Sequence, residues 1–324
     1  MSSFDDVAAA LLEIPGLRVE RGAPLSRYTR FGIGGAAAAL AGTGEREAFQ
    51  RALRTVRAAG ARHAVIGGGT NLIVSDAGFD GIVLRFTGNR ISRSGGLVTA
   101  ESGAGLQELV EYANEAGLRG LETLAGIPGW VGAAIYGNAG AYGHSIAERV
   151  EQVRFSDGES ERTFSRGECA FRYRESIFKR NKQWIILDAV LRLEPAPREQ
   201  LRRVSGEILK IRNEKFPPSL KCAGSVFKNL LLAELPPEAA GRVPPQVVRE
   251  GKVPAAWFLE QSGAKQVSRG GIRVAAYHAN LIYNAGGGTA RELCEVIAEL
   301  KSRVRRDFGI ELEEEVQYVG FGGA

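Results

Sequence analysis

The sequence is poor in the residues that build metal centres and disulfide frameworks. Its few cysteines and histidines lie far apart along the chain, at Cys169, Cys222, Cys294, His63, His144 and His278. The cysteines are odd in number and form no C-x-x-C pair, so neither a disulfide framework nor a zinc knuckle is predicted. We therefore expect no metal site.

Long apolar runs are missing too. No stretch approaches the roughly 20 apolar residues that span a bilayer. The first residues, "MSSFDDVAAALLEIPG", carry acids where a secretory signal has a basic region. We therefore expect a cytoplasmic protein without a membrane partner.

A strong charge of one sign is also absent. The net charge is +5, from 42 Lys and Arg against 37 Asp and Glu. The densest basic stretch, "LKSRVRRDFG", alternates with apolar residues at helical spacing, which is typical of a solvated helix face. We expect no nucleic-acid partner, although a modest basic surplus suits small anionic ligands.

The 324 residues exceed one ordinary core, so two or three domains are expected. Apolar spacing predicts helices over 46–60, 106–117, 198–215 and 289–309. Thr289 with Glu292 forms a capping box at the start of the last helix, and Gly309 stops it. The helix over 198–215 has Leu201, Val204, Ile208 and Ile211 as its apolar stripe, and the composition changes near residue 195.

Strands are predicted over 62–68, 150–160, 184–194 and 310–320, with two more strands around a turn in 72–86. Strands and helices mix without a strict βαβ repeat, so α+β and α/β folds both stay open at this point. Alternation in the last strand places Glu313 and Glu315 on one face and Glu314 on the other.

The 42 glycines gather in blocks at 31–39, 66–74, 101–109, 125–143 and 284–290. None of the blocks matches a P-loop or a Rossmann fingerprint. One interpretation is that they only form tight turns. The other is that backbone N–H groups made accessible by glycine bind a pyrophosphate, with polar contacts from Thr70, Asn71, Asn138 and Tyr142.

Two charged motifs admit a structural and a functional interpretation. In "FRYRESIF" (171–178), Arg174 comes just before a predicted strand. It is either an edge-strand residue in a surface ion pair or an arginine that binds a carboxylate with both of its terminal nitrogens. In "LEEEV" (312–316), the glutamates are either a solvated strand edge or the lining of a cleft on one face.

The stretch "CAGSVFKN" (222–229) contains a serine behind a glycine, Ser225. A hydrolase elbow would read G-x-S-x-G, and the second glycine is missing. The one base available to a nucleophile is His278 in "YHANLIYN", whose asparagines suggest hydrogen bonding to a ligand instead. Ser225 is therefore either a turn residue or a proton donor.

In order along nearly the whole chain, "RYTRFGIGG", "IGGGTNLIV", "GIPGWVGAAIYGNAGAYG", "FRYRESIF", "CAGSVFKN", "HANLIYN" and "GIELEEEV" resemble the UDP-N-acetylenolpyruvoylglucosamine reductase (UDP-N-acetylmuramate dehydrogenase) family. The resemblance implies an α+β fold. An N-terminal segment (1–28) would precede an FAD-binding domain (29–195) of two α+β subdomains, of the vanillyl-alcohol oxidase / p-cresol methylhydroxylase type. An α+β substrate-binding domain (196–324) with the C-terminal catalytic strand would follow.

The family activity implies non-covalent FAD and NADPH as hydride donor. Hydride would pass from NADPH to FAD N5 and then to the methylene carbon of the enolpyruvyl sugar nucleotide, after which Ser225 would protonate the neighbouring carbon. The product, UDP-N-acetylmuramate, is a peptidoglycan precursor, so the protein would serve cell-wall biogenesis, cell shape and cell division. We expect a monomer with small-molecule partners.

The family's catalytic residues fall on Arg174, Ser225 and Glu315. A guanidinium offsets the carboxylate charge that grows during reduction, whereas a glutamate helps only if it is protonated, with a raised pKa, or orients a donor. The implied cofactor-binding residues are Gly67, Gly68, Gly69, Thr70, Asn71, Leu72, Gly126, Ile127, Pro128, Gly132, Asn138, Ala139, Gly140, Tyr142 and Gly143. The implied substrate-binding residues are Tyr173, Lys221, Lys228, Asn229, His278 and Asn280.

The sequence departs from the family pattern at Glu314, where proline usually precedes the catalytic glutamate. Alternation separates Glu315 from Glu314 but not from Glu313, so the register stays open. Only about ten residues separate Arg174 from the next predicted strand, which indicates the shorter subgroup that lacks an inserted tyrosine loop. Two alternatives are an FAD oxidase or dehydrogenase on the same fold and a non-catalytic flavin- or nucleotide-binding protein. The intact Arg174, Ser225 and Glu315 favour the reductase.

Overall fold

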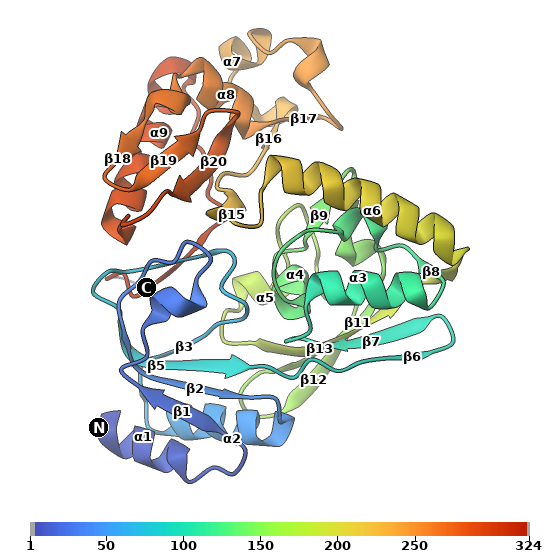
Figure 1. Cartoon of the computed structure of the whole chain (residues 1–324), viewed down its shortest axis with the longest axis vertical. Helices are drawn as coiled ribbons and strands as arrows, with labels where there is room; N and C mark the ends of the chain where they lie inside the picture. The colour runs from blue at the N-terminus through green and yellow to red at the C-terminus, as the bar shows by residue number, and fades with distance from the viewer. Residues whose placement is uncertain (1–3, 323–324) are drawn as a thin grey trace. The chain divides into compact units, whose positions relative to one another are not determined.

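The computed structural model describes residues 4–322, which form two compact units (Figure 1). Unit 1 contains 4–23, 37–68 and 80–214, and unit 2 contains 24–36, 69–79 and 215–322. These units differ in extent from the N-terminal segment, FAD-binding domain and substrate-binding domain predicted above. Residues 1–3 and 323–324, which belong to the first and last of those predicted parts, lie outside the described range. The functional division stays a prediction.

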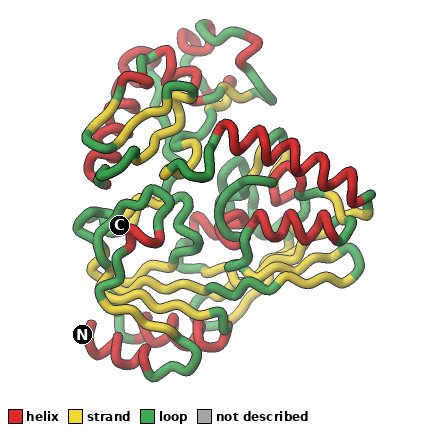
Figure 2. The backbone as a smooth tube through the Cα atoms, viewed as in Figure 1, coloured by secondary structure: helices red, strands yellow, loops and turns green. Residues whose placement is uncertain are grey.

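Unit 1 begins with a four-stranded sheet in the order β1-β2-β5-β3. Its strands are β1 (Arg18–Arg21), β2 (Ala37–Thr43), β3 (His63–Val65) and β5 (Phe79–Phe86). Helices α1 (Phe4–Leu12) and α2 (Arg46–Ala58) pack on it (Figures 1 and 2). The helix predicted over 46–60 is confirmed as α2, and the apolar residues whose spacing predicted it are buried, because Phe49, Leu53 and Val56 pack with Ile82 and Leu84 of β5.

The rest of unit 1 is built on a five-stranded antiparallel sheet in the order β12-β11-β13-β7-β6. Its strands are β6 (Ile91–Ser94), β7 (Leu97–Glu101), β11 (Val150–Ser156), β12 (Glu161–Ser165) and β13 (Ile185–Arg192). The helices of this part are α3 (Leu106–Glu115), α4 (Val131–Tyr136) and α5 (Ile177–Arg180). Phe155, Phe178 and Trp184 form an aromatic cluster in its core. Unit 1 thus contains two α+β parts, each with its own hydrophobic core.

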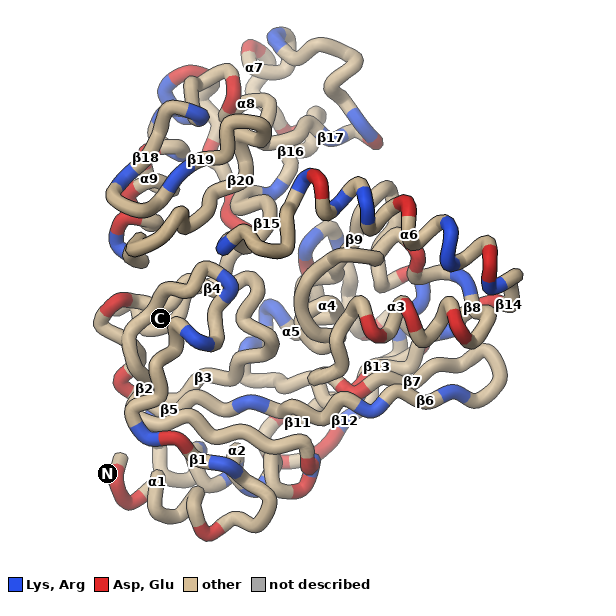
Figure 3. Tube along the Cα trace, in the orientation of Figure 1, with Lys and Arg blue, Asp and Glu red and all other residues tan. Residues whose placement is uncertain are grey.

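Helix α6 (Arg198–Lys215) follows the change in composition near residue 195, yet most of it belongs to unit 1. The reason is its contact with α3, where buried Asn114 Nδ2 donates a 2.9 Å hydrogen bond to Ser205 Oγ. Leu201 is buried as predicted, but Ile211 is 52% exposed, so its assignment to the buried stripe was wrong. The helix carries both charge signs along its length (Figure 3).

Unit 2 has an antiparallel sheet in the order β15-β20-β19-β18. Its strands are β15 (Lys221–Ser225), β18 (Ser268–Arg269), β19 (Ile272–Ala275) and β20 (His278–Asn284). Helices α8 (Ala255–Gln261) and α9 (Ala290–Phe308) share its core. The predicted capping box of α9 is confirmed, because Thr289 and Glu292 exchange hydrogen bonds of 3.1 and 3.0 Å. Gly309 ends the helix at φ +67°.

The strand predicted over 310–320 forms only as β21 (Gln317–Val319), which pairs in parallel with β4 (Leu72–Val74). Residues 310–316 lie outside any strand and share a single isolated bridge, Phe227 with Glu314, instead of a continuous ladder. The predicted alternation persists, since Leu312 and Val316 are buried while Glu313 is exposed.

The remaining elements are short. The two-residue strands are β8 (Leu118–Arg119), β9 (Gly140–Ala141), β10 (His144–Ser145), β14 (Glu194–Pro195), β16 (Leu230–Leu231) and β17 (Lys252–Val253). The short helices are α7 (Pro237–Gly241) and the 3-10 turns Leu25–Tyr28, Glu122–Leu124, Ile146–Glu148, Leu232–Glu234, Pro245–Val247 and Ala264–Gln266. Within residues 4–322, no helix is both long and apolar enough to cross a membrane.

Candidate active site

Arg174 lies in a tight turn of unit 1 that we call the arginine loop (171–176). Arg172 and Glu175 bridge across it, and Arg174 takes a left-handed conformation with φ +57°. The interpretation of Arg174 as an edge-strand residue was therefore wrong, and the short helix α5, capped by Ser176 Oγ, follows where a strand was expected. A left-handed arginine is rare and strained, and such strain concentrates at functional sites.

Three hydrogen bonds join the arginine loop to the glycine block 125–143. Arg174 Nη2 donates to the carbonyl of Gly140 at 3.1 Å. Asn138 Nδ2 donates to the carbonyl of Arg172 at 2.8 Å, and Ser176 Oγ to that of Tyr136 at 2.7 Å. The Arg174 guanidinium also lies 5.4 Å from the Tyr173 ring centroid. Unit 1 thus brings the predicted pair Tyr173 and Arg174 against the predicted cofactor-binding block.

The glycine block has a backbone that side chains would obstruct. A Cβ on Gly140 would lie 2.4 Å from the carbonyl oxygen of His144, and one on Gly132 would lie 2.7 Å from Ser102. Asn138 and Tyr142 adopt φ of +44° and +54°. Asn138 is buried, whereas Tyr142 is 51% exposed. Of the other predicted residues, Gly126, Ile127 and Pro128 precede α4, Ala139 precedes β9, and Gly143 lies between β9 and β10.

The turn at Gly67 and Gly68 lies against Trp130. A Cβ on Gly68 would lie 3.2 Å from the indole, so a side chain there would crowd Trp130. Arg85 Nη2 donates to the carbonyl of Gly67 at 3.2 Å, and its guanidinium stacks 4.8 Å from the Trp130 ring centroid. A cation beside an open glycine turn suits a pyrophosphate. Sequence reasoning missed Arg85, although a basic residue within the buried apolar run of β5 is a usable signal.

Unit 2 places Ser225 at the end of β15, opposite Leu281. The backbone after it is held by Asn280, which is 2% exposed. Asn280 Oδ1 accepts hydrogen bonds from the amides of Val226 (3.1 Å) and Phe227 (2.9 Å). Its Nδ2 donates to the carbonyl of Phe227 at 2.8 Å. The Asn280 amide thus fixes the segment that follows the candidate proton donor.

The glutamates lie beside the same segment. The amide of Lys228 donates to the carbonyl of Glu313 at 2.9 Å, and the amide of Glu315 donates to the carbonyl of Val226 at 2.7 Å. The buried ammonium of Lys228 also donates to the Glu313 carboxylate. Extended geometry directs alternate side chains to opposite sides, so Glu313 and Glu315 share a side.

The second half of the loop 67–72 belongs to unit 2 and touches the glutamate segment. Asn71 Nδ2 donates to the carbonyl of Glu315 at 2.9 Å, and the amide of Gln317 donates to the carbonyl of Asn71 at 2.9 Å. Gly69 has φ +67°, and a Cβ there would lie 1.7 Å from the carbonyl oxygen of Tyr28. Thr70 follows it, and Leu72 begins β4. Unit 2 therefore brings Asn71, Ser225, Lys228, Asn280 and Glu315 into one neighbourhood.

The other predicted substrate residues are also in unit 2. Lys221 is exposed at the start of β15. Asn229 Oδ1 accepts a hydrogen bond from the amide of Ala255 at 3.3 Å, at the beginning of α8. His278 Nδ1 accepts from the amide of Asn280 at 3.2 Å. Burial, and secondly the charge of Lys215, lower the pKa of His278 to about 4, so its ring is neutral near pH 7.

Two family models match the chain. One is described as the C-terminal domain of UDP-N-acetylenolpyruvoylglucosamine reductase and matches 216–319, and the other is an FAD binding domain that matches 27–163. A UDP-N-acetylenolpyruvoylglucosamine reductase from Solibacter usitatus (strain Ellin6076) is 64% identical over 96% of this chain and 99% of its own length. The chain belongs to the UDP-N-acetylenolpyruvoylglucosamine reductase family.

Two further members of the reductase family extend the comparison. A UDP-N-acetylenolpyruvoylglucosamine reductase from Bacillus licheniformis is 34% identical over 98% of this chain and 99% of its own length. The crystal structure of the UDP-N-acetylenolpyruvylglucosamine reductase from Thermus caldophilus is 30% identical, covers 94% of this chain and 99% of its own, and has a TM-score of 0.73. Together these matches confirm the predicted family and the α+β fold with an FAD-binding domain.

The residues of unit 1 fit FAD as a cofactor of the reductase family. The turn at Gly67 and Gly68 packs closely against Trp130, and Arg85 supplies a positive charge beside it. In the glycine block 125–143, the backbone at Gly132 and Gly140 packs too closely against Ser102 and His144 to admit a side chain. The guanidinium of Arg85 and the backbone N–H groups of the glycine turn suit the anionic pyrophosphate of a dinucleotide.

Proposed function

We propose that the chain reduces the enolpyruvyl group of UDP-N-acetylglucosamine enolpyruvate to UDP-N-acetylmuramate, with NADPH as reductant, in peptidoglycan precursor synthesis. The observation that carries the proposal is the 64% identity to a reductase over 96% of the chain. Bound FAD would supply the two-electron carrier between NADPH and the enolpyruvyl group. The chain's own residues would bind the sugar nucleotide, stabilise the developing charge and deliver the proton.

Arg174 is proposed to hold the substrate carboxylate. During reduction, negative charge develops on the carbon next to the carboxylate and spreads into the carboxylate. A guanidinium that pairs with the carboxylate therefore stabilises the transition state. The arginine loop supports this role because its strained turn is tied to the glycine block by three hydrogen bonds. A side chain held this way loses little freedom when it binds.

Ser225 is proposed to protonate the neighbouring carbon. Its hydroxyl is a weak acid, but a carbanion conjugated to a carboxylate is a base strong enough to take the proton. The hydrogen bonds of the Asn280 side-chain amide support this role, because they fix the two residues after Ser225. Lys221, Lys228 or a water would then return a proton to the serine.

Glu315 is proposed as the third catalytic residue, acting on the developing enolate as a donor or by orienting one. The 2.7 Å bond from its amide to Val226 supports this assignment, since it ties Glu315 to the segment that carries Ser225. Glu313 is assigned a different role, because its carboxylate pairs with Lys228 and its side chain is 70% exposed.

The sugar nucleotide is proposed to bind near Tyr173, Lys221, Lys228 and His278. Asn280 and Asn229 bond to backbone groups of the protein, so we assign them to positioning the site. We place the protein in the cytoplasm as a monomer. We retain the functional division into an FAD-binding domain (29–195) and a substrate-binding domain (196–324).

The proposal is tested by separating the two half-reactions under anaerobic conditions. In Ser225→Ala, NADPH should bleach the bound flavin at the wild-type rate, whereas recovery of its colour on adding the enolpyruvyl substrate should slow. A general acid contributes about 10²–10⁴-fold, which sets the expected loss. Slow bleaching by NADPH instead would mean that Ser225 is structural.

The two glutamates provide a matched pair for the same assay. Glu315→Gln should cripple the recovery of colour and Glu313→Gln should not, because only Glu315 is assigned to the chemistry. The reverse result would move the catalytic assignment by two residues. Equal and complete activity of both variants would refute a catalytic glutamate at this segment.

A further inference from the structure

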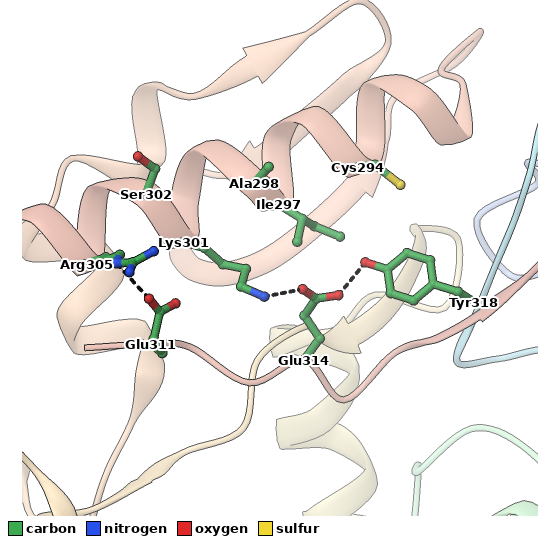
Figure 4. A pocket seen from close by; sticks show the side chains of 9 residues that line it. All are labelled: Cys294, Ile297, Ala298, Lys301, Ser302, Arg305, Glu311, Glu314 and Tyr318. Carbon is green, nitrogen blue, oxygen red and sulfur yellow. Dashed lines mark hydrogen bonds and ion pairs between the residues drawn. The ribbon is translucent and has the colours of Figure 1, made fainter. Parts of the chain in front are cut away.

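The Glu314 carboxylate is held on both oxygens by groups outside the proposed catalytic set. Lys301 Nζ on α9 donates to Oε1 at 2.8 Å, and the hydroxyl of Tyr318 donates to Oε2. The three side chains meet in a cavity of about 360 Å³ between α9 and the segment 311–318 (Figure 4). The Glu314 side chain is only 17% exposed, so this pair of contacts is partly shielded from water.

The backbone of helix α9, which carries Lys301, is held in place by buried residues and by caps at both ends. Leu300, one residue before Lys301, and Val304, three residues after it, are fully buried. Lys301 therefore starts from a fixed backbone and needs to order only its own side chain. Burial and the neighbouring Glu314 carboxylate raise the pKa of Tyr318, so its hydroxyl remains a donor over the working pH range.

The backbone around Glu314 shows what the contacts restrain. Phe227 and Glu314 face each other in a bridge, flanked by the bonds from Lys228 to Glu313 and from Glu315 to Val226. In such a non-hydrogen-bonded pair, the amide and carbonyl of Glu314 point away from Phe227. The single bridge supplies only two backbone bonds. A slip by one residue would turn Glu315 to the opposite side, and the burial of Leu312 and Val316 opposes it as well.

We propose that Glu314 is a positioning residue, whose carboxylate, clamped by Lys301 and Tyr318, fixes the side of the segment on which Glu315 is presented. The inference rests on the proposed catalytic role of Glu315. The clamp acts on the opposite side of the chain from Glu315. It adds to the backbone bonds of Glu313 and Glu315 in fixing the register over 313–315, where no continuous ladder forms.

The test uses the flavin-loaded protein and the two half-reactions. Glu314→Ala should leave bleaching by NADPH unchanged and slow the substrate-driven recovery of colour about tenfold or more, since a misplaced catalytic group loses transition-state contact. Tyr318→Phe, which removes one donor and keeps the ring, should give a smaller loss. Glu311→Ala is the matched control, because it removes the 2.8 Å ion pair with Arg305 at the far end of the same cavity.

Proline provides the rescue variant. In Glu314→Pro the ring fixes φ near −65°, and no ladder bond to Phe227 is lost, because the Glu314 amide faces away from that residue. Glu314→Pro should therefore recover most of the rate lost in Glu314→Ala. A side chain needed only for packing or local charge would not be replaced by proline, so an equally slow Glu314→Pro variant would overturn the proposal.

Hydrogen exchange supplies a readout that does not depend on catalysis. The Glu315 amide should exchange about tenfold faster in Glu314→Ala than in the wild type and in Glu311→Ala, because its bond to Val226 opens more often. Unchanged exchange or unchanged kinetics in Glu314→Ala would overturn the proposal. If Glu315→Gln also keeps the wild-type rate, the proposed function of Glu315 has failed, and the exchange measurement alone still decides whether the clamp fixes the register.

Discussion

Replacing Asn280 by alanine removes three hydrogen bonds that hold the backbone after Ser225. The amide of Val226 keeps a second acceptor, the carbonyl of Asn280 at 3.1 Å, which the substitution preserves. The amide and carbonyl of Phe227, by contrast, lose their bonds of 2.9 and 2.8 Å. Two buried polar groups are therefore left without these partners.

The size of the effect follows from that count. Each buried polar group that loses its partner costs about 1–3 kcal/mol. Water that enters the space vacated by the amide relieves part of the cost, so we expect Asn280→Ala to lower the free energy of unfolding by about 2–4 kcal/mol. Asn229→Ala is the control, since Asn229 is exposed and its bond to Ala255 is 3.3 Å long. It should cost less than about 1 kcal/mol.

The assay is urea denaturation of the flavin-loaded protein, followed by circular dichroism and tryptophan fluorescence. An unchanged denaturant slope confirms that the unfolding transition is comparable between variants. A loss below about 0.5 kcal/mol in Asn280→Ala, within the range of ordinary surface substitutions, would refute the reasoning.

Asn280→Asp sharpens the test, because it keeps the shape and the acceptors but turns a carboxylate oxygen towards the Phe227 carbonyl. Burial raises the pKa of such a carboxyl in the folded state above its unfolded value of about 3.9. The deficit of Asn280→Asp relative to the wild type should therefore be fully present above the folded pKa and should shrink as the pH falls through it. A deficit independent of pH would contradict the assigned contact.

The remaining predictions concern His278 and Gly69. His278 has a pKa lowered to about 4, so between pH 6.5 and 4 the unfolded chain binds a proton that the folded chain does not, and wild-type stability should fall with pH by about 2–3 kcal/mol over that window. His278→Gln should flatten this part of the stability profile, and an identical profile in the variant would exclude His278 as its source. Gly69→Ala should cost more than about 3 kcal/mol in urea denaturation, because its Cβ would lie 1.7 Å from the carbonyl oxygen of Tyr28. Gly95→Ala, at a similar positive φ with nothing within 4 Å, should cost only about 1 kcal/mol, and equal losses would show that crowding at Gly69 is unimportant.

Local signals made some parts of the fold predictable. The cap of α9 at Thr289 and its stop at Gly309 depend on neighbouring residues, so their sequence pattern was sufficient. The buried stripe of α2 follows from helical spacing alone. Spacing does not show how far a helix stays in contact with its neighbour, and for that reason Ile211 near the end of α6 was misassigned.

The features that position the site depend on contacts distant in sequence. Asn280 bonds to Phe227, and Asn71 bonds to Glu315 across 244 positions, and neither contact has a local signature. The left-handed φ of Arg174 likewise follows from the bonds between the arginine loop and the glycine block. Motif order predicted the segments that are proposed to carry the site, whereas the backbone bonds of Asn280 and the contacts of Glu314 are seen only in the structure.

The central claim is that the chain transfers reducing equivalents from NADPH to an enolpyruvyl sugar nucleotide through bound FAD. The most direct measurement is an anaerobic absorbance titration of the purified, flavin-loaded protein. NADPH should bleach the flavin, and UDP-N-acetylglucosamine enolpyruvate should then restore its colour in stoichiometric amount. Flavin that NADPH fails to bleach, or that recovers its colour only with oxygen or another acceptor, would contradict the account and favour an oxidase or dehydrogenase.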